Sequence, residues 1–128
     1  MSGALASIRY VKFDQVTAVL LILNPDRPPL DEAAEAELQD AHLAYLAELH
    51  EAGQLLAAGP LADLPDRVLR GLSLFSADVE TVERLAAQDP AVIAGKFTVK
   101  VMSWTMPSGA MRFERTEFPR SIADAVGE

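Results

Sequence analysis

The chain contains no cysteine, and this absence removes several kinds of chemistry at once. Disulfide bonds, thiolate metal sites and a cysteine nucleophile are all excluded, which suits a protein of the reducing cytoplasm. Half of the 128 residues are hydrophobic, so a core can form without cross-links. The length is typical of one domain, and we expect a single domain spanning residues 1–128.

Basic residues are also few. The chain carries 11 of them against 19 acidic residues, a formal net charge of −8. Such a surface repels phosphate backbones and anionic lipids, and no basic run interleaved with aromatic residues offsets it. We therefore expect neither nucleic-acid binding nor membrane binding.

No long hydrophobic run is present. The longest is Val16–Leu23, interrupted by Thr17, and it is far shorter than the roughly 20 residues that span a bilayer. Asp14 precedes the run, and the proline-rich segment Asn24–Pro29 follows it where a signal peptide would have a cleavage site of small residues. The run predicts a buried strand in a cytoplasmic protein.

The remaining patterns alternate between strands and helices. Strands are expected at 16–23, 54–61, 68–75 and 96–104, with a bulge near Gly71. Helices are expected after the N-caps Asp31 and Asp78, ending at Gly53 and before Asp89-Pro90, with a short helix at 121–126. The core would cover about 16–106, with an N-terminal arm at 1–15 and a C-terminal tail at 107–128.

This order predicts an α+β, ferredoxin-like βαββαβ fold with an antiparallel sheet. Both helices would cover one face of the sheet, and the chain would have nothing of its own for the other face. An apolar open face favours a homodimer packed sheet to sheet, with Trp104 in the interface. The polar tail would lie across the partner or stay mobile.

Two histidines lie on the first predicted helix. His42 falls within the apolar stripe formed by Leu38, Tyr45 and Leu49, whereas His50 falls on its flank, toward solvent. From these residues alone, a core histidine bonded to a backbone carbonyl is the favoured interpretation of His42. The histidines face different directions, and neither an H-E-x-x-H motif nor a glycine-rich phosphate loop is present, so no metal or cofactor is expected.

Several short motifs occur in a characteristic order. They are Ala41–Leu46 followed by Gly53, Ala58–Leu61, Arg70-Gly71, Asp89–Val92 with Ala94-Gly95, and Trp104 with Pro107 and Gly109. Together, over about Val16 to Met111, they make the chain resemble the YCII-related (YciI-like) family. The arm and the tail after Met111 depart from the plainest family members, and both can change access to a pocket.

The resemblance implies a dimeric α+β barrel and an active site that pairs His42 with Asp89. The few activities linked to the family and its neighbours are lyase, dehalogenase or isomerase reactions on small aromatic or lactone-like compounds. With the resemblance, His42 is favoured as a general acid/base, with Asp89 orienting it. An N-cap for the short helix after Pro90 is an equally good account of Asp89.

We therefore predict a small-molecule enzyme with a cofactor-free pocket between the helices and the sheet edge. The predicted catalytic residues are His42 and Asp89. The predicted substrate-binding residues are Tyr45, Gly59, Pro60 and Arg70, for which packing, turn geometry and solvated surface are the simpler explanations. The alternative is a non-catalytic ligand-binding or accessory dimer. An enzyme needs a His42 that solvent can reach, whereas a structural histidine can be sealed.

Overall fold

A computed structural model describes residues 10–127, and residues 1–9 of the predicted arm lie outside the described part. The elements follow in the order β1 (Phe13–Leu23), α2 (Glu32–Glu51), β2 (Leu55–Pro60), β3 (Leu69–Phe75), α3 (Val79–Ala87), α4 (Pro90–Ile93), β4 (Phe97–Pro107) and α5 (Ile122–Val126). The predicted βαββαβ order is confirmed.

The two longest strands, β1 and β4, extend further than predicted. They pair antiparallel over their whole length, from Phe13 opposite Pro107 to Leu23 opposite Phe97. The predicted start of β1 at residue 16 and the predicted end of β4 at residue 104 were wrong, because both were placed by the pattern of apolar side chains. Backbone hydrogen bonds continue the ladder into an exposed end where the side chains no longer alternate.

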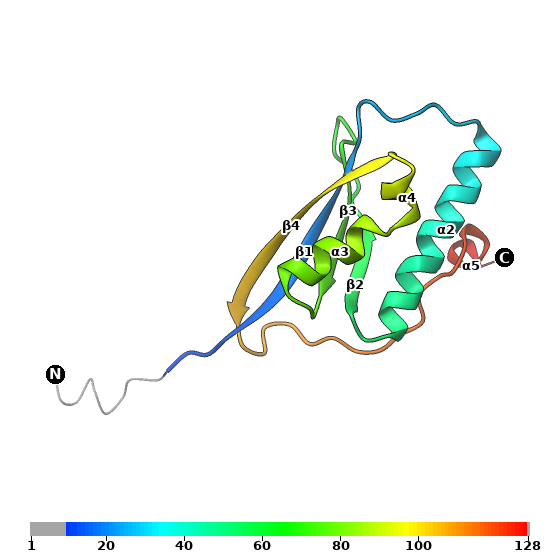
Figure 1. The fold of residues 1–128 in the computed structure, drawn as a ribbon. Helices are drawn as coiled ribbons and strands as arrows, with labels where there is room; N and C mark the ends of the chain where they lie inside the picture. The colour runs from blue at the N-terminus through cyan, green and yellow to red at the C-terminus, as the bar shows by residue number, and fades with distance from the viewer. Residues whose placement is uncertain (1–9, 128) are drawn as a thin grey trace, which may run out of the picture.

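The sheet has the strand order β2-β3-β1-β4, with every neighbouring pair antiparallel. This is the ferredoxin-like arrangement, and both α2 and α3 lie on one face of it (Figure 1). The main core lies between these helices and the sheet. Its buried residues are Val19, Leu49, Leu55, Phe75, Val82 and Ala86. Val99 and Val101 of β4 pack against this cluster, so the core joins both helices to all four strands.

The helices begin where the sequence predicts. The Asp31 carboxylate accepts a hydrogen bond from the Ala34 amide at 2.8 Å, and Asp78 accepts from the Thr81 amide at 2.9 Å. Gly53 follows α2 with a left-handed φ of 82°, which glycine adopts without strain. No helix within residues 10–127 is long and apolar enough to cross a membrane.

The chain was predicted to leave the sheet face opposite the helices bare. The structure shows instead that this face is partly covered. Val16, Ala18, Leu74 and Met106 form a second buried cluster there, and Phe113 of the tail packs against it. Beside this cluster the Trp104 side chain remains 41% exposed. The chain thus covers one part of this face and leaves an apolar part open.

The tail is ordered on its own domain, which corrects the prediction that it stays mobile, while its crossing of a partner stays a prediction. After β4 it passes the end of the sheet and reaches α2, where α5 lies beside that helix (Figure 1). The Thr116 amide donates to His50 Nε2 at 3.1 Å, and the Ile122 amide donates to an Asp40 carboxylate oxygen at 2.7 Å. The Phe118 ring stacks on His50.

Candidate functional site

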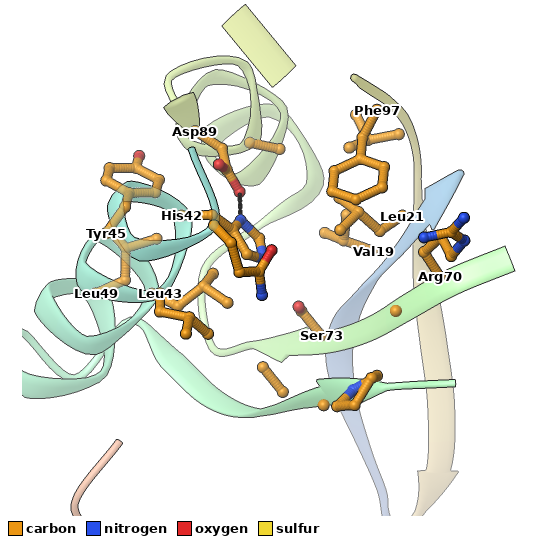
Figure 2. Close-up of a pocket in the computed structure, with 18 of the residues that line it drawn as sticks. Val19, Leu21, His42, Leu43, Tyr45, Leu49, Arg70, Ser73, Asp89 and Phe97 are labelled. Atoms are coloured by element: carbon orange, nitrogen blue, oxygen red, sulfur yellow. Dashed lines mark hydrogen bonds and ion pairs between the residues drawn. The ribbon is translucent and has the colours of Figure 1, made fainter. Parts of the chain in front are cut away.

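A cavity of about 550 Å³ lies between α2 and the sheet. Strands β1 and β3 contribute Val19, Leu21 and Phe75, and α2 contributes Leu43 and Leu46 from the opposite side. Figure 2 shows His42 pointing from α2 toward this space, with Asp89 behind it. Most of the lining is apolar, so a bound molecule would lose much of its contact with water.

His42 and Asp89 form a direct hydrogen bond. His42 Nδ1 lies 2.7 Å from Asp89 Oδ2, and the two residues are only 7% and 4% exposed. The other carboxylate oxygen, Oδ1, accepts the Ala91 amide at 2.9 Å and so caps α4, in which Pro90 is the first residue. Asp89 therefore holds the helix with one oxygen and the histidine with the other.

This bond determines which ring nitrogen of His42 faces the cavity. A carboxylate accepts hydrogen bonds, so in the neutral imidazole Nδ1 carries the proton and Nε2 has the lone pair. Within residues 10–127, Nε2 has no hydrogen-bond partner, and no fully buried side-chain nitrogen or oxygen lacks one. Nε2 is consequently not completely buried, and the His42 ring that carries it points toward the cavity (Figure 2).

Lys96 and Phe97 border the site on the β4 side. The Phe97 ring centre lies 6.1 Å from that of His42, and the Lys96 ammonium lies 5.3 Å from the Phe97 ring centre. Lys96 Nζ also donates to a Glu35 carboxylate oxygen at 2.7 Å. The charge of Lys96 is thus already neutralised by α2.

Tyr45 contributes its ring to the cavity but not its hydroxyl. The hydroxyl donates to the Leu85 backbone carbonyl at 2.7 Å and is therefore not directed at a ligand. Figure 2 shows this hydroxyl directed away from the cavity. Burial, with the negative charges of Asp89 and Glu48, raises the pKa of Tyr45. The phenol therefore stays protonated and keeps its bond to α3.

The other predicted substrate-binding residues, Gly59, Pro60 and Arg70, also line the cavity. They come from the β2–β3 hairpin. A Cβ at Gly71 would lie 3.4 Å from the Gly59 carbonyl oxygen and 3.5 Å from Leu21 Cβ. These are ordinary van der Waals distances, so the packing around Gly71 leaves room for a methyl group.

Part of the cavity wall comes from residues that the sequence analysis did not select. These are Phe118, Pro119, Ile122 and Ala125 of the tail, and Ser73 of β3. The tail was predicted to affect access to the pocket but not to form part of its wall. An aromatic residue followed by proline, just before the capping residue Ser121, was the available signal that this segment packs against something.

His50 is buried, at 4% exposure, and the prediction that it faces solvent was wrong. Its Nδ1 lies 2.7 Å from the Leu55 carbonyl oxygen, while Nε2 accepts the Thr116 amide. The periodicity of α2 placed this residue on the flank of the helix correctly. The tail, which no helical pattern reveals, then covers that flank.

The fold and the site together define a class: a ferredoxin-like α+β domain with a histidine–carboxylate pair beside an apolar cavity. The family comparison names it more closely. The YCII-related domain matches residues 18–105, most of the chain, and the protein belongs to that family. No curated protein sequence matches this chain.

One similar solved structure is the 5-chloro-2-hydroxyhydroquinone dehydrochlorinase (TftG) from Burkholderia phenoliruptrix AC1100, in complex with 2,5-dihydroxybenzoquinone. The two proteins share 22% sequence identity, and the TM-score is 0.50. The match covers 70% of this chain and 92% of the dehydrochlorinase. The likeness shows that the two proteins have the same fold.

Proposed function

We propose that this protein is an enzyme that uses His42 as a general acid/base on a small cyclic compound. The observation that carries the proposal is the 2.7 Å bond between His42 Nδ1 and Asp89, which leaves Nε2 directed at the cavity. Histidine changes its charge near neutral pH, so it can accept and return a proton under physiological conditions. Asp89 would hold the ring in the reactive tautomer and stabilise the imidazolium.

The reaction would be an elimination or an isomerisation. His42 Nε2 takes a proton from the substrate, and the electron pair of the broken bond forms a new π bond. In an elimination the leaving group departs as an anion; in an isomerisation the proton returns to another carbon. Such a positioned base typically supplies about 10²–10⁴-fold of rate acceleration.

The cavity favours a substrate of one or two rings. Its volume of about 550 Å³ lies within the range of small-molecule sites, and its apolar walls suit a ring rather than a chain of hydroxyl groups. The dehydrochlorinase with the same fold supports the elimination among these reactions. We therefore place chlorinated hydroxyquinols first among the compounds to test.

We further propose a homodimer formed through the open part of the sheet. Trp104 and Met102 are exposed there beside the buried cluster around Ala18. A large aromatic side chain at the centre of such a patch is typical of an interface. Sedimentation equilibrium would give a dimer for the wild type and a monomer for Trp104→Glu. A wild-type monomer at high concentration would contradict the assignment.

The experiment for the enzymatic proposal compares the wild type with His42→Gln. Glutamine retains hydrogen-bonding capacity but cannot take up a proton. Chloride release from 5-chloro-2-hydroxyhydroquinone, and deuterium uptake into unchlorinated analogues in D₂O, would be measured with both proteins. We expect the variant to lose about 10²–10⁴-fold in kcat while it still binds the compounds. Binding without turnover in the wild type would instead establish a ligand-binding module.

A further inference from the structure

Basic residues outnumber acidic residues in the cavity lining, whereas acidic residues outnumber basic residues in the whole chain. Three cationic side chains line it (Arg67, Arg70 and Lys96), and Asp89 is the single carboxylate among them. The chain as a whole has 19 acidic and 11 basic residues. An acidic protein thus keeps a cationic lining where a ligand would bind.

Two of these cations have no carboxylate partner within the part of the chain that the structure describes. Lys96 pairs with Glu35, and Asp89 is engaged by His42. Within residues 10–127, no carboxylate lies within 4.0 Å of a charged nitrogen of Arg67 or Arg70. The positive charge that remains uncompensated in the cavity therefore belongs to this arginine pair.

A β-bulge explains why Arg70 reaches the cavity. Leu21 pairs with Gly71 but Ile22 pairs with Leu69, so Arg70 is an extra residue on β3. In a regular strand Arg70 would share the face of Leu72, which packs on the opposite side of the sheet. A bulge re-aims the extra side chain, and such bulges are frequent beside active sites.

The Arg70 guanidinium is also held in place. Its Nε donates to the Arg67 carbonyl oxygen at 2.5 Å, which leaves both terminal nitrogens for another acceptor. Arg67 has a left-handed φ of 54°, a conformation that costs energy for any residue with a side chain. The unfavourable backbone conformation of Arg67 thus accompanies the hydrogen bond that anchors Arg70.

We propose that Arg70, supported by Arg67, binds an ionised oxygen group of a ring compound, either a carboxylate or an acidic enol. Figure 2 places Arg70 across the cavity from His42, with the apolar Val19 and Leu21 between them. The ligand would lay its ring on these residues and present its anion to the two terminal nitrogens, a geometry suited to guanidinium. This assignment of substrate class rests on the proposed function.

The test uses two ring compounds of the same shape, 4-hydroxybenzoate and its neutral amide, 4-hydroxybenzamide. Calorimetric titration of the wild type should give at least about tenfold tighter binding of the anion, because a charged acceptor gains a strong bond to arginine. Arg70→Gln should remove this preference, whereas Arg84→Gln, an equal charge change on the exposed face of α3, should keep it. 2,5-Dihydroxybenzoquinone, ionised at neutral pH, tests the enol in the same way.

A second variant covers the case in which Arg70→Gln does not fold. Arg67→Gly removes one cation at a left-handed position that glycine prefers, so it should fold and lose part of the preference. Equal affinity of the wild type for both probes, absent binding of either, or a preference retained in both arginine variants would overturn the proposal. His42→Gln should retain the preference, so a failure of catalysis and a failure of anion recognition give different results.

Discussion

His42 and His50 lie on the same helix and are about equally buried, yet their hydrogen bonds differ completely. His42 bonds a carboxylate through Nδ1 and has no partner on Nε2 within residues 10–127, whereas His50 uses both nitrogens, toward the Leu55 carbonyl and the Thr116 amide. Phe118 stacks on the His50 ring with 4.0 Å between ring centres. Burial alone therefore does not distinguish the two histidines, whereas the hydrogen bonds of their Nε2 atoms do.

Among changes to the hydrogen-bond partners of the two histidines and to the tail, replacing the partner of His42 should have the largest effect. Asp89→Asn retains an N-cap for α4, since asparagine caps as well as aspartate, but removes the charge that stabilises the imidazolium. We expect kcat to fall by at least about tenfold while urea stability changes little. Steady-state kinetics and urea unfolding would be compared on one preparation. If kcat of Asp89→Asn equals that of the wild type, the only role of Asp89 is to cap α4.

The next effect should follow from removing His50. His50→Ala leaves the Leu55 carbonyl and the Thr116 amide without their partner, at a cost of about 1–3 kcal/mol in the free energy of unfolding. Amide hydrogen exchange at Thr116 should accelerate as the tail detaches. His50→Gln, whose amide can both donate and accept, is the matched control and should lose less. An unchanged exchange rate would show that other contacts hold the tail.

A spectroscopic difference should appear without any mutation. Nitrogen-15 NMR of the neutral imidazoles should show the Nδ1-protonated tautomer for both histidines, because both Nδ1 atoms face acceptors. Addition of 4-hydroxybenzoate should then shift the Nε2 signal of His42 and leave that of His50 in place. A shift of the His50 signal alone would place the ligand at the tail instead.

The smallest effect concerns the ion pair between Arg120 and Glu51, which ties the tail to the end of α2. The hydrogen bond and charge of Arg120 lower the pKa of Glu51 below its usual value. A lowered folded-state pKa means that the pair stabilises the fold above the unfolded pKa and loses that effect as the pH falls through the folded one. The melting temperature of Glu51→Gln should therefore be slightly lower than that of the wild type at neutral pH. The two melting temperatures should converge in acid. A difference that persists in acid would have another origin.

Sequence patterns predicted the elements well because each has a local chemical signal. Asp31, Asp78 and Asp89 cap helices in the structure as their positions indicate. The bulge beside Gly71 was also predicted, although not its consequence for Arg70. Local signals were sufficient wherever a residue interacts with near neighbours along the chain.

Contacts between distant segments were harder to predict. The surroundings of His50 depend on Thr116 and Phe118, which reach it only after the chain has passed the sheet. The pairing of His42 with Asp89 likewise joins α2 to α4, and the family resemblance, not the periodicity of α2, suggested it. Neither contact has a spacing rule, because each depends on how the helices pack.

The tail described above has a consequence for how such a protein can diversify. The family match ends at residue 105, whereas Phe118, Pro119 and Ile122 complete the wall of the cavity from beyond it. The segment that bears His42 and Asp89 and the segment that closes the wall are thus separable stretches of one gene. Replacement of the tail would therefore alter the wall of the cavity and leave the hydrogen bond between His42 and Asp89 in place.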